Sequence, residues 1–233
     1  NCLEYGGIFQ GNGFSIKNIV IDRTNKGRYK DAGLFCGLKD ATVENLAIDD
    51  SCSFTGKYAG ALSVSVTGSL TVRNVTNKAA VNGTERVGGF VGYMLRIKGG
   101  NVSFFDCVNE ANVTSSDYYT GGFIGLMEAN ENMNMSFSGC YNSGNISGNQ
   151  NVGGFVGYVF SNKMNMNMSF SSCSNGGNIS GNQNVGGFVG YVSNNENMNM
   201  TFLSCANNGF IKGRTELGGL IGYIDNNKNM TMS

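Results

Sequence analysis

Apolar residues in this chain occur in short runs bounded by glycine, asparagine and serine, and the same runs return at a fixed period. The clearest run is Val87-Gly88-Gly89-Phe90-Val91-Gly92-Tyr93. Copies follow at 121–125, 153–158, 186–191 and 218–223, so that successive copies lie 33, 32, 33 and 32 residues apart. A period this regular is typical of a repeat protein, in which each repeat packs on its neighbours.

A second segment follows each glycine pair, as in Ser136-Phe137-Ser138-Gly139-Cys140 and Ser169-Phe170-Ser171-Ser172-Cys173. Its two apolar residues are three positions apart, whereas inward positions of one flat strand differ by two. The spacing therefore predicts two short strands with a bend at the small or polar residue between them. Earlier copies are expected at 15–21, 42–48 and 71–75.

Glycine recurs too often for helices, and the remaining residues favour strands and turns. We therefore predict an all-β chain that forms a parallel β-solenoid, with a right-handed coil. Aligning the second glycine of each pair predicts about eight turns of 26–33 residues, at Gly7, Gly33, Gly60, Gly89, Gly122, Gly154, Gly187 and Gly219. A β-propeller is the alternative, although its blades need roughly 40 residues. Residues 1–79 would form divergent turns and residues 80–233 regular ones, in a single array that is expected to belong to a longer chain.

In a solenoid, equivalent residues of successive turns stack into columns. Cys107, Cys140, Cys173 and Cys205 form one such column, and Val75, Leu46 and Ile19 align with it upstream, so this position is predicted to lie in the core. An asparagine column follows two residues later, at Asn77, Asn109, Asn142, Asn175 and Asn207. Stacked asparagine amides can hydrogen-bond from turn to turn.

Composition excludes several functions. The chain has no histidine, hence no imidazole base or metal ligand. Its 16 basic and 16 acidic residues balance, so no basic field attracts nucleic acid. No apolar run reaches the roughly 18 residues that span a bilayer, so membrane insertion is not expected. We expect no cofactor and no metal site.

The glycine-pair elements, with the Asn/Gly stretch that precedes them as at 145–152, resemble GLUG-motif repeats. These repeats occur in surface and secreted proteins of bacteria and some protists, including adhesin-like and IgA-peptidase-type chains. The resemblance covers residues 80–233 well and residues 1–79 loosely. It implies an extracellular repeat region, and it brings no catalytic residues because the motif is structural in that family.

Seven cysteines leave at least one unpaired. We favour buried free thiols for the cysteine column, because parallel side chains one turn apart suit a disulfide poorly. A bridge between Cys2 and Cys36, or between Cys36 and Cys52, is more plausible.

A catalytic interpretation would rest on carboxylates in adjacent turns. Asp22, beside Arg23, could stack with Asp49 and Asp50 to share a proton or hold calcium, but solvated turns are the favoured interpretation. Tyrosines beside the glycines could stack on sugars, although a structural role is favoured for Tyr5, Tyr58, Tyr93, Tyr158, Tyr191 and Tyr223.

Asparagine also heads ten Asn-x-Ser/Thr sequons, the acceptor sequence for N-linked glycans. They are Asn74, Asn82, Asn101, Asn112, Asn134, Asn145, Asn167, Asn178, Asn199 and Asn229. The repeat copies any sequon it contains, so these are not independent signals.

Together these features predict a non-enzymatic structural or adhesive protein, located outside the cell or on its surface, that forms a rigid rod, filament or surface layer. Its expected partners are further copies docked end to end, other extracellular structural proteins, or glycans. The alternatives are a carbohydrate-binding module and a polysaccharide-active β-helix enzyme.

Overall fold

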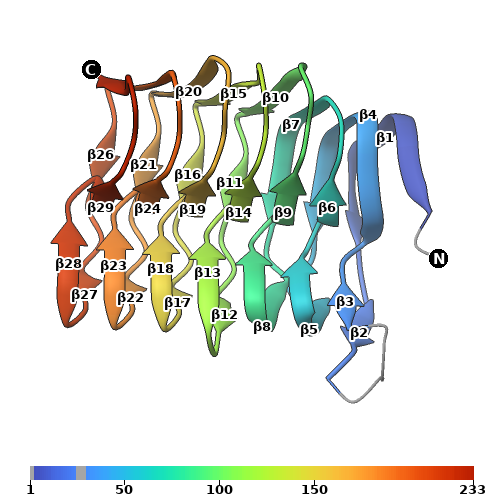
Figure 1. Ribbon diagram of the computed structural model, residues 1–233. Coiled ribbons are helices and arrows are strands. Elements are labelled where there is room, and N and C mark those ends of the chain that lie inside the picture. Colours follow the sequence, from blue (N-terminus) through green and yellow to red (C-terminus); the bar gives the residue numbers. More distant parts are fainter. Residues whose placement is uncertain (1–2, 25–29) are drawn as a thin grey trace.

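The computed structural model describes residues 3–24 and 30–233, and every regular element within them is a β-strand. The strands wind into a parallel β-solenoid of about seven turns, in which the sequence colours run from one end of the rod to the other (Figure 1). Described strands pair in parallel with the equivalent strand of the neighbouring turn. The solenoid prediction is confirmed, and the propeller alternative is wrong because no blade of sequential antiparallel strands is found in the described ranges.

The turns differ in regularity along the rod. The N-terminal turns contain longer strands: β1 (Glu4–Ile16), β2 (Val20–Asp22), β3 (Asp31–Ala32), β4 (Phe35–Ile48), β5 (Ser53–Gly60), β6 (Ser63–Val66), β7 (Leu70–Asn77), β8 (Ala80–Gly88) and β9 (Val91–Leu95). Each later turn contains five short strands.

The first two of these later turns consist of β10 (Asn101–Phe105), β11 (Val108–Asn109), β12 (Val113–Ser115), β13 (Tyr118–Gly121), β14 (Ile124–Glu128), β15 (Asn134–Ser138), β16 (Tyr141–Asn142), β17 (Ile146–Ser147), β18 (Gln150–Gly153) and β19 (Val156–Phe160). The rest consist of β20 (Met166–Ser171), β21 (Ser174–Asn175), β22 (Ile179–Ser180), β23 (Gln183–Gly186), β24 (Val189–Ser193), β25 (Met198–Leu203), β26 (Ala206–Asn207), β27 (Ile211–Lys212), β28 (Thr215–Gly218), β29 (Ile221–Asp225) and β30 (Thr231–Met232).

The bend predicted between the paired apolar residues is present. Gly139, between Phe137 and Cys140, has a φ of 63°, and Asp106 and Ser172 occupy the same corner with a φ of 52°. This left-handed conformation turns the chain sharply enough for both flanking apolar side chains to point inward. The bend therefore separates β15 from β16 and recurs in each regular turn.

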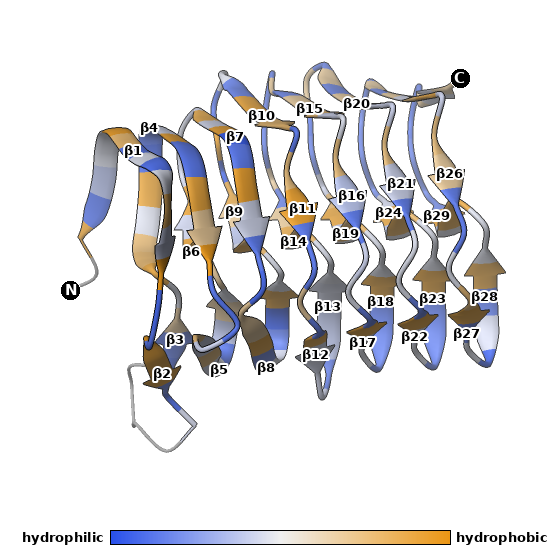
Figure 2. Ribbon diagram, turned by 180° about the vertical axis from the view of Figure 1, so that it is seen from behind, coloured by the Kyte–Doolittle hydropathy of each residue, from blue (hydrophilic) through white to orange (hydrophobic). Residues whose placement is uncertain are grey.

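Aromatic side chains fill the core in two columns. The Phe123 and Phe155 rings stack 4.7 Å apart with an interplanar angle of 2°. In the second column the Phe137 and Phe170 rings stack 5.0 Å apart, and the two columns meet edge to face. All four rings are fully buried. Hydrophobic positions recur at the same place in successive turns (Figure 2), so each phenylalanine packs on its own copies.

The asparagine column is also buried and is hydrogen-bonded as predicted. Asn142 Nδ2 donates to Asn175 Oδ1 at 2.6 Å and to the carbonyl oxygen of Gly144 at 3.0 Å. Asn109 Nδ2 donates in turn to Asn142 Oδ1 at 2.8 Å. Each asparagine side chain thus hydrogen-bonds to the backbone of its own corner and to the asparagine of the next turn. A second buried column, which the sequence analysis missed, runs through Asn130, Asn162 and Asn195.

Three details of the predicted alignment are wrong. Gly60 pairs with Gly88, the first glycine of its pair, and Ala32 pairs with Ala59, so Gly33 and Gly60 belong to the column of first glycines and not to that of second glycines. Gly7 does not belong to the glycine column, because it pairs with Ala41 inside β1 and β4, so the turns number about seven rather than eight. Ile19 does not precede Leu46 in the cysteine column, because Phe14 occupies that place. The extra residues Gly11–Gly13 shift the register of β1 at this point.

Candidate functional surfaces

The cysteine column lies in the core as free thiols. Cys107, Cys140 and Cys173 are buried and Cys205, in the last full turn, is partly exposed. A hydrogen bond to the Cys107 thiol raises the pKa of Cys140 to about 12. A hydrogen bond to Cys140, together with burial, raises the pKa of Cys173. Because the thiolate is the reactive form, these cysteines act as small core residues.

We expect Cys140 and Cys173 to resist alkylation while the chain is folded. At pH 8 iodoacetamide should modify Cys140 about a thousandfold more slowly than in the unfolded chain, since so little thiolate is present. Cys205 should be the fastest of the four because it is partly exposed. Peptide mass spectrometry after timed labelling measures both rates, and equal labelling of Cys140 in the folded and unfolded chains would contradict the buried column.

Of the two expected disulfides of Cys36, the structure tests the one with Cys52. Cys36 is disulfide-bonded. Cys52 is a buried free thiol, so a Cys36–Cys52 bridge is wrong. Cys2, the other expected partner of Cys36, lies outside the described residues.

The carboxylates considered for catalysis are not stacked on one another. Asp22 is in register with Thr55, whereas Asp49 follows Ile48, which is in register with Ile16. Asp49 accepts hydrogen bonds from the Ser51 hydroxyl at 2.7 Å and the Ser51 amide at 3.1 Å, which lower the pKa of Asp49. Asp22 accepts similarly from the Thr24 amide at 2.9 Å.

Each of these aspartates therefore stabilises its own turn, in agreement with the favoured interpretation. Asp50 is exposed beside Asp49, and the backbone amide of Arg23 bonds to Thr55. In the described part of the chain, no three His, Cys, Asp or Glu side chains are grouped closely enough to hold a metal ion.

A polar cluster in the N-terminal turns was missed by the sequence analysis. The Arg86 guanidinium lies 4.9 Å from the Tyr58 ring centroid, 5.2 Å from that of Tyr93 and 4.0 Å from a Glu128 carboxylate oxygen. Burial raises the pKa of the nearby Asp31. Asp31, Tyr58 and Arg86 occupy one column, but they differ in residue type, so the repeat alone does not reveal them. Within this cluster the Arg86 guanidinium contacts a carboxylate and two tyrosine rings from adjacent turns, so its charge and the ring faces already have partners.

The predicted tyrosines do not all share one column. Tyr93, Tyr158, Tyr191 and Tyr223 form a tyrosine column, interrupted by Leu126, whereas Tyr5 and Tyr58 lie in other columns. Tyr158 stacks on Tyr191 at 4.8 Å and 3°, and Tyr119 covers the other face of Tyr158 at 5.2 Å. The Tyr158 hydroxyl is 2.7 Å from Ser193 Oγ, and burial raises the pKa of Tyr158 to about 12. A sugar ring stacks on the face of an aromatic ring. Inside the rod the faces of Tyr158 and Tyr191 are covered, and of this column Tyr223 in the last turn is 42% exposed, so the structural interpretation is favoured.

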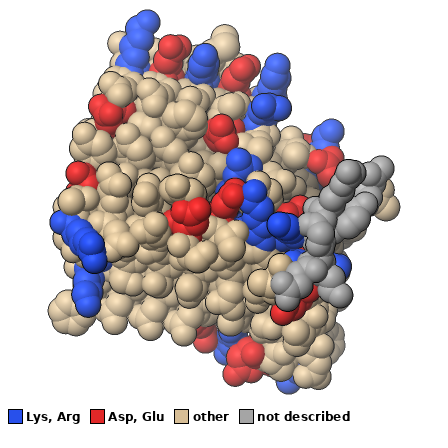
Figure 3. All heavy atoms as spheres, turned by 60° about the horizontal axis from the view of Figure 1, so that its bottom comes forward, with Lys and Arg blue, Asp and Glu red and all other residues tan. Residues whose placement is uncertain are grey.

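Charged residues form an alternating column along one edge of the rod. Its members lie in successive turns in the order Lys98, Glu131, Lys163, Glu196 and Lys228. Backbone bridges join Lys98 to Glu131, Glu131 to Lys163, and Glu196 to Lys228. Figure 3 shows alternating basic and acidic side chains along one edge of the molecule. This order places opposite charges in neighbouring turns. A strand paired one turn further along would face a like charge instead, so the order favours the observed pairing of the turns.

Replacing Glu131 with lysine should place three like charges in consecutive turns. We expect Glu131→Lys to lower the free energy of unfolding by about 1 kcal/mol at low salt. The loss should shrink in 1 M salt, where the screening length is about 3 Å. Urea unfolding at both salt concentrations measures this effect, with Glu131→Gln as the neutral control, and a loss that is independent of salt would argue against electrostatic pairing.

The ten sequon asparagines all lie on the surface. Four of them stack on an outer sheet face, where Asn134 Nδ2 donates to Asn101 Oδ1 at 3.0 Å and Asn167 Nδ2 to Asn134 Oδ1 at 2.9 Å, with Asn199 continuing the column. Three others, Asn112, Asn145 and Asn178, form a second column in the loops that lead into β12, β17 and β22. By contrast, none of the nine buried asparagines in the described ranges heads a sequon.

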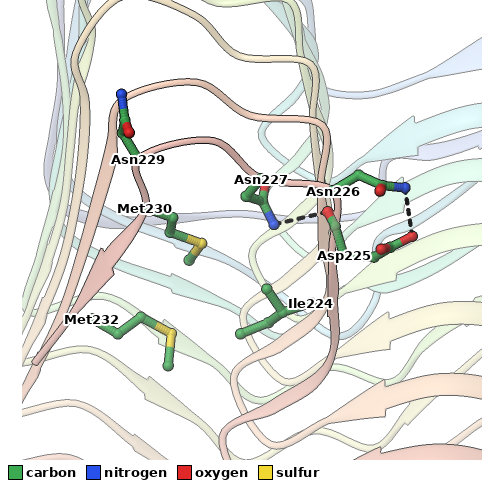
Figure 4. Close-up of a pocket in the computed structure, with 7 residues that line it drawn as sticks. All are labelled: Ile224, Asp225, Asn226, Asn227, Asn229, Met230 and Met232. Atoms are coloured by element: carbon green, nitrogen blue, oxygen red, sulfur yellow. Dashed lines mark hydrogen bonds between the residues drawn. The ribbon is translucent and has the colours of Figure 1, made fainter.

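Both ends of the described rod expose apolar side chains. At the C-terminal end, a hollow of about 560 Å³ is lined by Phe202, Leu220, Ile221, Ile224, Met232 and Ser233. An adjoining hollow receives the side chains of Ile224, Met230 and Met232 (Figure 4). At the N-terminal end Phe14 is 74% exposed. These positions belong to columns that are buried elsewhere in the rod.

Comparison with known proteins supports the fold. The chain matches no known family model, so the GLUG resemblance stays a prediction. Over 89 residues, which are 38% of this chain, it is 38% identical to halomucin from Haloquadratum walsbyi, and the chain spans about 1% of that protein. A crystal structure of a candidate immunoglobulin A1 protease from Bacteroides ovatus superposes with a TM-score of 0.61 at 16% identity, covering 94% of this chain and 68% of the other. That likeness shows the fold alone.

No helix in the described ranges is long and apolar enough to cross a membrane.

Proposed function

We propose that this chain is a rod-forming structural segment of a protein that lies outside the cell or on its surface. The observation that carries the proposal is the continuous stacking of like side chains, with phenylalanine, cysteine and asparagine columns passing through the regular turns. Repeated residues contact their own copies in neighbouring turns, so the repeat maintains a stiff coil. The partial likeness to halomucin supports a surface location.

Two measurements test this function. A protease added to intact cells should digest the chain, and a membrane-impermeant amine reagent should label it. A chain that these reagents reach only after lysis would refute the surface location. When one molecule is pulled by its ends, extension should increase in steps of one turn. A turn of 33 residues releases roughly 110 Å of chain. A single global step would show that the turns do not act as separate mechanical units.

We also propose that this 233-residue segment, as a separate chain, docks end to end on other copies of itself. Both ends expose residues of the core columns, and unpaired strand edges accept further parallel strands. Sedimentation at increasing concentration should show linear oligomers. Leu220→Lys combined with Ile224→Lys should abolish them, whereas Tyr141→Lys, at a wall position that is 39% exposed, should not. Oligomers that survive the double variant would exclude this end as the contact.

A further inference from the structure

From the geometry of the sequon columns we infer that Asn112, Asn145 and Asn178 carry N-linked glycans in one line along the rod. The inference rests on the proposed surface location, because the chain must meet a glycosylating secretory route. It concerns one column of the ten candidate asparagines, which the structure separates from the others.

The side chains of this column are oriented by their oxygens. Asn112 Oδ1 accepts from the Asn145 backbone amide at 3.1 Å, Asn145 Oδ1 accepts from the Asn178 amide at 3.1 Å, and Asn178 Oδ1 accepts from the Phe210 amide at 3.2 Å. The planar amide group then directs Nδ2 away from that contact. Among the described residues Nδ2 of these asparagines has no hydrogen-bond partner, and all three side chains are exposed.

The column on the outer sheet face is arranged differently. There, beyond the first member Asn101, Nδ2, the atom that would receive the sugar, donates to the neighbouring turn, as in Asn167 to Asn134 and Asn199 to Asn167, both at 2.9 Å. These asparagines also stand within strands β15, β20 and β25 rather than in loops. The loop column is therefore the one in which the reacting nitrogen of every member is free and the folded turn accommodates the product without losing a contact. Asn82 and Asn101 also have no Nδ2 partner among the described residues, but they stand within strands β8 and β10.

The transfer needs a lipid-linked saccharide phosphate as donor. The bond from the anomeric carbon to the phosphate oxygen breaks, and its electron pair stays with the phosphate. A bond forms from that carbon to Nδ2, which loses one proton to solvent, and nothing is oxidised or reduced. The sequon hydroxyls are Thr114, Ser147 and Ser180.

A line of glycans would also suit the chemistry of this surface. Between Asn132 and Ile211 the chain carries just two charges, Lys163 and Glu196. A flat neutral sheet rich in asparagine and serine is prone to stack face to face, and attached saccharides would keep it hydrated and apart from its neighbours.

Glycopeptide mass spectrometry of the full chain isolated from its own cells tests the inference. Fragmentation of the glycopeptides should place saccharide on Asn112, Asn145 and Asn178, and none on Asn149 and Asn182, which lie in the same peptides as Asn145 and Asn178. The latter pair is a matched control, because Asn182 Nδ2 donates to Asn149 Oδ1 at 2.7 Å in another asparagine column that lacks sequons. Unmodified asparagines at all three positions, or saccharide confined to the sheet-face column, would overturn the inference.

Variants of the hydroxyl residue separate the sequon from the fold. Ser147→Ala should remove the mass of one glycan, and Ser147→Thr should retain it, since threonine preserves the acceptor sequence. An unchanged mass in Ser147→Ala would contradict attachment at Asn145. Protease treatment of intact cells distinguishes the two proposals: a surface chain without these glycans refutes the glycan line alone, and a chain confined to the cell interior refutes the proposed function as well.

Discussion

Gly154→Ala is expected to lower the free energy of unfolding by about 3 kcal/mol or more, because the added methyl group would meet backbone rather than a movable side chain. A Cβ at Gly154 would lie 2.2 Å from the carbonyl oxygen of Gly187 and 3.0 Å from the Asn175 amide group. Neither neighbour can rotate away, because the carbonyl belongs to the next turn and Asn175 is held in the buried column. The overlap of the added methyl group with these atoms could be removed only if the two turns moved apart.

The last turn supplies the control. Gly219 occupies the same place in the motif, but a Cβ there meets nothing within 4 Å. Gly219→Ala should therefore unfold at nearly the same urea concentration as the parent chain. Equilibrium unfolding followed by circular dichroism compares the two variants. Equal losses would show that the glycine pair is required for its backbone conformation and not for the close approach of successive turns.

The regular turns could be predicted from the sequence because each turn repeats the side chains of the one before. The cysteine column, the asparagine column and the bend at Gly139 all follow from spacing alone, since equivalent residues in a solenoid must stack. The period of 32–33 residues fixed those equivalences without knowledge of how many strands a turn contains.

The N-terminal turns could not be aligned in the same way. Their repeats are shorter and carry insertions, so an alignment on glycines places Gly7 in a column to which it does not belong and shifts Gly33 and Gly60 by one residue. The structure shows register shifts in the pairing of β1 with β4 and of β5 with β8. A shift of one residue moves every following side chain to another column. For the same reason the cluster around Arg86 was not predicted.

The candidate surfaces were predictable in residue type and not in position. All ten sequons can be read from the sequence, but the direction in which each asparagine points depends on the corner before it. Asn142 and Asn145 are three residues apart, yet the first is fully buried and the second exposed. The hydrogen-bond partners of Nδ2 and Oδ1 belong to the neighbouring turn, which lies 32–33 residues away in sequence.

Asn142→Asp should make the stability of the rod depend steeply on pH. The new carboxyl would replace Nδ2, which now donates to Asn175 Oδ1 and to the Gly144 carbonyl, so an ionised group would place an oxygen against two acceptors. The site is fully buried, and burial raises the pKa of a carboxyl in the folded state above the unfolded value of about 3.9. Below that value the carboxyl is protonated in both states and can donate one hydrogen bond.

As the pH rises above about 4, the unfolded state ionises first, and the free energy of unfolding should fall by about 1.4 kcal/mol per pH unit until the folded-state pKa is reached. If that pKa is about 7, the variant loses roughly 4 kcal/mol between pH 4 and pH 7 relative to the parent chain. Asn182→Asp is the control, because Asn182 belongs to an exposed column where an ionised carboxyl is solvated, and it should show little of this slope. Urea midpoints measured from pH 4 to pH 8 compare them. Parallel curves for the two variants would mean that the buried amide column opens to water, and a steep curve for Asn142→Asp alone would show that the amides hold the turns together in a dry core.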